Sequence, residues 1–290
     1  MIPVFRTPIL ILAWRRPDCL RRLIRVVRIV KPKYLYAAVD GPRPNNGKEK
    51  EKIKECIRIL TTEVDWECRL RLLSSAKNLG CRDGVRRGLD WFFSNVKEGI
   101  VLEDDCIPHH DFFAYCETLL NYYRNDPKVV FISGDNSHGI ESGFADSSYT
   151  FIRTPLVWGW ASWSSHWMSH DRDMTIWENY SKLGHRPTLF YSEDEHKHMC
   201  SIFDQICYYG VPNTWDYQYA ASILVNHQLC IVPRSNLVSN VGFGDDATHT
   251  KGGNRRANSM THPVFPIRHP EAIELDVIAD RQVFTRVHCS

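Results

Sequence analysis

Three consecutive acidic residues, Glu103-Asp104-Asp105, follow the short apolar run Ile100-Val101-Leu102. Where a buried strand leaves the core, adjacent carboxylates repel one another and lose hydration, and a cation makes such clustering tolerable. Neighbouring side chains of a strand alternate between its faces, so we expect Glu103 and Asp105 to point one way and Asp104 the other. One carboxylate could then bind a hard divalent metal ion, which stabilises a pyrophosphate leaving group. The alternative is a solvated strand end, with an aspartate capping the following helix.

The elements that must position this triplet alternate between strand and helix over the first half of the chain. Apolar residues recur at helical spacing between short apolar runs. The runs predicted as strands are Ile9 to Ala13, Tyr34 to Val39, Arg69 to Leu73, Ile100 to Leu102 and Val129 to Ser133. This rhythm predicts an α/β fold with a mostly parallel central sheet and helices on both faces. Ligands bind such sheets beyond the carboxyl ends of the strands, where Asp40 and the triplet both lie.

The pattern becomes irregular from about residue 136. Glycine, serine and tryptophan dominate Ser137 to Trp167, and regular helices resume near Ser192 and Trp215. The chain contains no internal repeat and no low-complexity tract. We therefore interpret residues 1–135 and 136–290 as two halves of one domain, the second being an elaboration that completes the site.

The composition is that of a globular protein. The chain has 290 residues, 43% of them hydrophobic and 24% charged, with a formal net charge of +2. This balance argues against disorder and against a nucleic-acid partner. No run reaches the roughly 18 apolar residues of a membrane span, and the N-terminus lacks a signal-peptide core, although an anchor outside this sequence stays open. The ten cysteines form no CxxC pair, so we expect free thiols in a cytoplasmic protein, with a disulfide framework as the alternative.

The residues around the triplet resemble those of a known family. A strand, then Glu-Asp-Asp, then Pro108 to Phe113 is similar to the metal-binding segment of GT-A fold glycosyltransferases, above all the N-acetylglucosaminyltransferase I type. Further segments occur in the family's order along roughly residues 8 to 250, but Ser164 to Asn213 has no counterpart. These segments are Pro8 to Ala13 with Arg15 to Pro17, Val39-Asp40, Val157 to Trp160, Trp215 to Tyr217, and Cys230 to His249.

The resemblance implies a metal-dependent transferase that moves a hexose or N-acetylhexosamine from a nucleotide sugar, expected to be UDP-linked, to an acceptor hydroxyl with inversion. Asp105 would hold Mn²⁺ or Mg²⁺, and Glu103 and Asp104 would contact ribose, sugar or metal-bound water. The first half would bind the nucleotide sugar, and the second would bind the acceptor and perform catalysis. The acceptor could be a glycan, a lipid-linked sugar or a protein, and a lipid-linked acceptor is compatible with peripheral association at the inner face of a membrane.

The resemblance assigns the catalytic base to Asp216. A carboxylate within hydrogen-bond reach of the acceptor hydroxyl could remove its proton during attack on the anomeric carbon. The bulk of Trp215 could partly desolvate this carboxylate and raise its proton affinity. The alternative is an N-cap, because apolar residues from Tyr219 to Leu224 follow at helical spacing.

Several basic and polar residues are candidates for binding the nucleotide. Arg15 and Arg16 stand beside a strand end, where arginine suits phosphate or uracil recognition, and Asp40 resembles a uracil-binding aspartate. Arg82 and Arg86 lie one helical turn apart and are candidates for the diphosphate. The structural alternatives are surface charges for the arginines and a turn former in Asp-Gly-Pro for Asp40.

The second half supplies candidates for contacts with the sugar and the metal. Trp158 and Trp160 lie in a glycine- and serine-rich stretch, and one of the two is expected to stack on the sugar, although tryptophan is more often buried. Gly242 to Asp246 reads as a loop suited to closing over a donor. His249 beyond it could reach the metal or the pyrophosphate. The pairs His109-His110 and His196/His198 are interpreted as surface features.

Two other functions use overlapping features. A sugar nucleotidyltransferase also combines an α/β sheet with metal-binding acids, but it normally carries a glycine-rich phosphate loop after the first strand. In this chain Trp14-Arg15-Arg16-Pro17 occupies that place. A non-catalytic carbohydrate-binding protein would need the tryptophans and not the acidic triplet, and the absence of metal-dependent nucleotide binding would favour it.

Overall fold

The computed structural model describes residues 5–141, 143–243 and 258–288. Its core is an eight-stranded sheet with the strand order β3-β2-β1-β4-β8-β6-β9-β7, and β5 pairs with β10 in a separate ribbon. The strands are β1 Ile9–Ala13, β2 Tyr34–Val39, β3 Arg69–Ser74, β4 Glu98–Glu103, β5 Cys106–Pro108, β6 Val129–Ser133, β7 Tyr149–Ile152, β8 Trp160–Trp163, β9 Leu229–Pro233 and β10 Val238–Asn240.

Six of the eight strands run in the same direction. The sheet is parallel from β3 through β2 and β1 to β4, and again between β6 and β9, whereas β8 and β7 are antiparallel to their neighbours. Strands β7, β8 and β9 come from the second half of the chain, so both halves of the sequence build one sheet.

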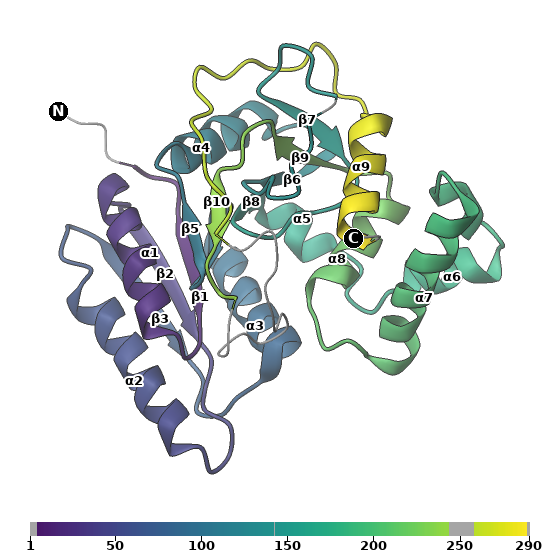
Figure 1. The fold of residues 1–290 in the computed structure, drawn as a ribbon. Coiled ribbons are helices and arrows are strands. Elements are labelled where there is room, and N and C mark those ends of the chain that lie inside the picture. The colour runs from purple at the N-terminus through teal and green to yellow at the C-terminus, as the bar shows by residue number, and fades with distance from the viewer. Residues whose placement is uncertain (1–4, 142, 244–257, 289–290) are drawn as a thin grey trace.

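Helices cover both faces of the sheet (Figure 1). On one face α1, α2 and α4 pack against alternate strand residues such as Ile9, Ile11 and Leu35. On the other face α3, α5, α8 and α9 pack against the intervening residues, including Leu10 and Leu12. Helices α6, α7 and α8 surround a third apolar cluster, and α6 and α7 lie at the right of Figure 1. The helices are α1 Pro17–Val30, α2 Gly47–Thr62, α3 Gly80–Asn95, α4 Asp111–Tyr123, α5 Ser164–Ser169, α6 Thr175–Lys182, α7 Glu193–Tyr209, α8 Asp216–Val225 and α9 Val277–His288, with a 3₁₀ turn at Arg186–Leu189.

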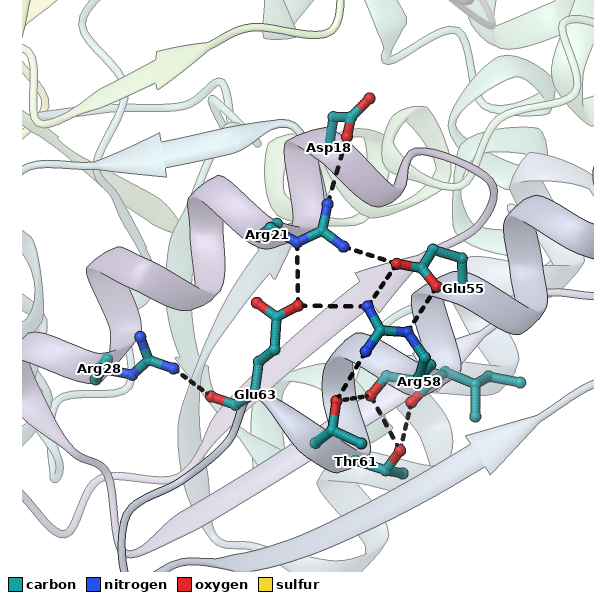
Figure 2. A network of polar contacts seen from close by, with 9 residues as sticks. Asp18, Arg21, Arg28, Glu55, Arg58, Thr61 and Glu63 are labelled. Carbon is teal, nitrogen blue, oxygen red and sulfur yellow. Dashed lines mark hydrogen bonds and ion pairs between the residues drawn. The ribbon is translucent and has the colours of Figure 1, made fainter.

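An ion-pair network joins α1 to α2 on their solvent side (Figure 2). Arg21 contacts Glu63 at 3.0 Å and Glu55 at 2.7 Å, and Arg58 binds the same two carboxylates. The hydrogen bond from Arg58, with Arg21 adding to it, lowers the pKa of Glu55. Exposed pairs contribute little individually, so the apolar contacts beneath the network hold the two helices to the sheet.

The α/β architecture predicted from the sequence, a mostly parallel sheet with helices on both faces, is confirmed. Every strand predicted in the first half is present, and the helices near Ser192 and Trp215 begin at Glu193 and Asp216. The nine cysteines in the described residues are all free thiols, as expected. None of the described helices combines the length and apolar content that a bilayer crossing requires.

The turn after β2 packs closely against the segment that leads into α3. A Cβ atom at Gly41 would lie 2.5 Å from the carbonyl carbon of Lys77 and 2.6 Å from its backbone nitrogen. Backbone atoms cannot move aside as a flexible side chain can. The absence of a side chain at Gly41 therefore brings the end of β2 and the start of α3 together.

We predict that Gly41→Ala lowers the free energy of unfolding by about 1–3 kcal/mol, because overpacking forces the backbone near Lys77 away. Chemical denaturation measures the change. The control is Gly47→Ala, where a Cβ would have no atom within 4 Å. Equal stability of the two variants would contradict the close packing described above.

Candidate functional site

The ends of three parallel strands open into one cavity. The amide of Asp40 donates to the carbonyl of Ala13 at 3.0 Å, and the amide of Asp104 donates to that of Leu12 at 2.9 Å. These bonds continue the sheet just beyond β2 and β4, so residues that follow the two strands lie on either side of β1. The cavity has a volume of about 370 Å³, and its walls include Asp40, the acidic triplet and Trp158.

All three carboxylates of the triplet line this cavity. The predicted alternation of faces is wrong, because β4 ends at Glu103 and the chain turns at Asp104 and Asp105. Asp104 accepts from the backbone amide of Trp14 at 3.0 Å and from Arg16 at 3.3 Å. Arg16 also pairs with Asp105. Asp104 and Asp105 are each only 5% exposed, so the turn holds two carboxylates out of solvent around one guanidinium.

The electrostatics of the triplet favour an added cation. Burial raises the pKa of Glu103 and that of Asp104 well above the ordinary carboxyl range, and repulsion from Asp105 raises both further. Arg16 opposes these shifts but is a single positive charge. Hard divalent ions prefer carboxylate oxygens, so the donor set fits Mn²⁺ or Mg²⁺.

The triplet is not a three-ligand cage. In the described part of the chain, the only three potential ligand groups whose atoms lie within 4.8 Å of one another are His109, His110 and Asp111. His110 Nε2 lies 3.0 Å from Asp111 Oδ1 at the start of α4, and none of the three lines the cavity. The geometry therefore suits one or two triplet carboxylates binding an ion together with ligand oxygens.

Asp40 organises the turn before α3. Its carboxylate accepts from the amides of Gly41 at 2.8 Å and Leu79 at 3.0 Å, and from the side chain of Asn78 at 2.8 Å. Burial nevertheless raises its pKa above the usual range. Asp40 thus lines the cavity while it holds the start of α3 in place, which combines the predicted turn role with a position suited to a ligand.

The arginines of the cavity are Arg16, Arg43 and Arg87. Of the arginines predicted to bind the nucleotide, Arg15, Arg82 and Arg86 do not line it. Arg15 pairs instead with the buried Glu49 at 3.3 Å and stacks on Trp14.

In two of these cases the arginine that lines the cavity is the next residue along the chain, Arg16 rather than Arg15 and Arg87 rather than Arg86. Adjacent positions face different ways on a helix or tight turn. Arg82 contacts its neighbour Asp83 at 3.0 Å. Arg87 hydrogen-bonds Ser75. Arg87 immediately precedes the buried Gly88 of α3. This place in the helical periodicity is the sequence signal that would have favoured Arg87 as a residue lining the cavity.

The two tryptophans occupy different environments. Trp160 is 1% exposed and stacks on Phe131 at 4.9 Å and Trp215 at 5.7 Å, so its faces are covered by protein. We therefore assign Trp160 to the apolar core, which corrects the prediction that it could contact a sugar. Trp158 is half-buried and lies edge-on to Phe243 at 5.7 Å in the cavity wall. Gly159 between them has φ +69°, a conformation that lets the chain turn from the core to the cavity.

A second cavity of about 210 Å³ adjoins the first, and Trp158 lines both. Asp216 lies in the second cavity, at the first residue of α8, and accepts from the hydroxyl of Thr214. Trp215, rather than Asp216, is the N-cap. The charge of Asp216 contributes to the raised pKa of Glu103, so the two carboxylates interact across the boundary between the cavities.

Part of the predicted closing loop borders the site. Gly242 and Phe243 line the first cavity, with Asn240 before them. The rest of that loop and His249, a predicted metal ligand, lie outside the described residues. Their roles stay predictions.

Comparison with known proteins gives only remote likenesses. No protein-family model matches the chain, and no curated protein is detectably similar in sequence. Among solved structures, a mannosyltransferase from Pyrobaculum calidifontis with GDP-Man and Mn²⁺ has a TM-score of 0.38 and 11% identity, over 77% of this chain and 76% of that one.

Two further structures are similar at the same level. The glucosyl-3-phosphoglycerate synthase of Mycobacterium tuberculosis, with Mn²⁺, UDP and phosphoglyceric acid, has a TM-score of 0.32 and 12% identity, over 55% of this chain and 57% of that one. A Bacillus anthracis protein proposed to be a glucose-1-phosphate thymidylyltransferase, with sucrose, has 0.34 and 12%, over 56% and 73%. None of the three is an N-acetylglucosaminyltransferase.

We predict that, with a metal chelator present, the free energy of unfolding falls as the pH rises from about 4 towards 8. The raised pKa values of Glu103 and Asp104 mean that the folded state holds more protons than the unfolded state in this range, so deprotonation favours unfolding. The expected loss is on the order of 1–3 kcal/mol, measured by denaturation at several pH values.

Saturating Mn²⁺ should remove most of this loss, and Glu103→Gln should flatten the profile in chelator. A profile that is the same with chelator, with Mn²⁺ and in Glu103→Gln would show that the triplet does not bind a cation.

Proposed function

We propose that this protein is a metal-dependent glycosyltransferase of the GT-A type, which transfers a sugar from a nucleotide sugar, expected to be UDP-linked, to an acceptor hydroxyl with inversion. The observation that carries the proposal is the arrangement of acids across two adjoining cavities. The triplet lies at the end of β4 in the first, and Asp216 lines the second, near enough for its charge to raise the pKa of Glu103. Such an arrangement separates a site for a diphosphate and its ion from a site for a nucleophile.

The first cavity offers matched groups for a nucleoside diphosphate. Arg16 and Arg87 are guanidinium donors suited to phosphate oxygens, and Asp40 can accept a hydrogen bond from a base. Asp105, with Glu103 or Asp104, would hold Mn²⁺ or Mg²⁺. When bound, such an ion would supply positive charge against the diphosphate of the donor. Trp158 would border the sugar at the junction of the two cavities.

The transfer itself requires one nucleophile and one base. The acceptor oxygen forms a bond to the anomeric carbon while its proton passes to the carboxylate of Asp216. The bond from the anomeric carbon to the diphosphate oxygen breaks, and the nucleoside diphosphate leaves with the electron pair. A single displacement of this kind inverts the anomeric centre. Thr214 positions the Asp216 carboxylate through its hydroxyl.

The nucleotidyltransferase alternative is less well supported. The segment after β1 is Trp14 to Pro17 and contains no glycine. Its Trp14 indole donates a hydrogen bond to the Gly41 carbonyl at 2.8 Å. A phosphate-cradling loop presents successive backbone amides, whereas this segment presents side chains.

We predict that Asp105→Asn weakens Mn²⁺-dependent UDP binding at least about tenfold, because the ion loses a charged ligand. Isothermal titration of UDP with and without Mn²⁺ measures the effect. His110→Ala, which removes a potential ligand from the cluster outside the cavity, is the control and should bind UDP normally. A defect in His110→Ala with normal binding by Asp105→Asn would move the metal site to the start of α4.

We predict that Asp216→Asn retains UDP and Mn²⁺ binding but lowers transfer by about 10²- to 10⁴-fold, because the amide cannot accept the proton. The measurement is UDP release from UDP-sugars with transfer to acceptor or to water. Asp194→Asn replaces an exposed acid in the first turn of another helix and should have no effect. Normal turnover by Asp216→Asn would eliminate the base assignment.

A further inference from the structure

The side chains that line the second cavity share a chemical character to which Asp216 is only one contributor. Its walls come from the segment before β8, from α7, α8 and α9, and from Asp135 after β6. It is a mixed pocket in which aromatic side chains and acids both face the interior. Its aromatic residues are Trp158, Phe190, Phe203, Tyr217 and Phe284.

The charged lining is strongly biased towards acids. Among the residues that the structure describes, four carboxylates line the cavity, against one guanidinium and one imidazole. The guanidinium, Arg153, is held by two of these acids, with Asp280 at 2.7 Å and Glu195 at 3.5 Å. Arg153 is also bound to the carbonyl of Leu189 and stacked on Tyr191. Its donors are thus engaged with protein, and it is poorly placed to receive an anionic group.

The other two acids that line the cavity are Asp216 and Asp135. Asp216 interacts with Glu103 at the boundary with the first cavity. Asp135 follows β6 and is buried, with Oδ1 accepting from the amide of Ser137 at 2.7 Å. Carboxylates accept hydrogen bonds from hydroxyl or ammonium groups and repel phosphates and carboxylates.

The aromatic wall completes the pattern. Trp158 is shared with the first cavity, and Tyr217 follows Asp216 directly and is only partly buried. Aromatic faces suit the apolar side of a sugar ring, while the acids satisfy its hydroxyls.

We infer that the second cavity binds the terminal sugar of a saccharide acceptor and that this sugar is neutral or carries an amine, but no acidic group. The ring lies against Trp158 and Tyr217, and its hydroxyls donate to Asp135 and Asp216. The inference rests on the proposed transferase function and adds the chemical class of its acceptor. Uronic acids, sialic acids and sugar phosphates are excluded as the residue that accepts the transfer.

The test uses the whole protein saturated with UDP and Mn²⁺. Saturation-transfer NMR would compare methyl glycosides of glucose, galactose, mannose, N-acetylglucosamine and glucosamine with the matched uronic acids and 6-phosphates. At least one uncharged or amino glycoside should bind about tenfold or more tightly than its acidic partner. Binding by none of the uncharged and amino glycosides, or tighter binding of the acidic ones, overturns the inference.

A matched pair of variants locates the binding. Tyr217→Ala should weaken glycoside binding about tenfold, because it removes one aromatic face, and it should leave UDP binding intact, since Tyr217 does not line the first cavity. Tyr209→Ala removes a tyrosine that is 78% exposed outside both cavities and should bind like the wild type. Unchanged glycoside binding in Tyr217→Ala would overturn the assigned site.

The measurement of UDP binding distinguishes a failure of the proposed function from a failure of the acceptor assignment. Failure of the wild type to bind UDP with Mn²⁺ defeats the proposed function itself. Normal UDP binding together with a preference for acidic glycosides defeats only the inference about the acceptor. Asp135→Asn supplies an independent measurement, because loss of its charge should reduce the discrimination against uronic acids.

Discussion

The structure is organised around the need to keep three adjacent carboxylates at the end of a central strand. Two of them are almost fully buried, and one guanidinium is their nearest compensation. That guanidinium, Arg16, comes from the turn after β1, and an amide from the same turn binds Asp104. Electrostatic contacts therefore hold β1, β4 and the turn that follows β1 in place together with apolar packing. A bound divalent cation would complete a charge balance that Arg16 alone leaves unfinished.

The first half of the fold could be predicted from the sequence because its signals are local and strong. Short apolar runs alternate with helical spacing, and Pro17 marks the start of α1. The second half of the fold was harder to predict from the sequence. Strands β7 and β8 have four residues each and are buried throughout, so no alternation of polar and apolar residues distinguishes them. Helices α5 and α6 are also short, and only tertiary contacts around Trp167 and Trp177 define them.

The same limits apply to the site. Residues at strand ends, such as Asp40 and Glu103, could be located because parallel strands place their carboxyl ends together. The direction in which each side chain points could not be predicted so well from the sequence. The choice between Arg15 and Arg16, or between Arg86 and Arg87, depends on the phase of a turn or helix. The choice between Trp158 and Trp160 depends on Gly159, whose positive φ reverses the chain between them. Asp135 carries the same strand-end signal, two residues after β6, but only the three-dimensional fold shows that it lines one cavity with Asp216.

The reversed direction of β8 has a consequence for how such a protein could diversify. Because β8 runs against β4 and β6, it begins at the edge where its neighbours end. The segment from Arg153 to Gly159 thus reaches the ligand-binding edge and supplies the wall common to both cavities. The acidic triplet belongs to a different strand and a different loop. Under the proposed function, changes in length or composition of this one segment could alter which sugars are joined while the residues proposed to bind the diphosphate stay intact, so that specificity and chemistry could evolve separately.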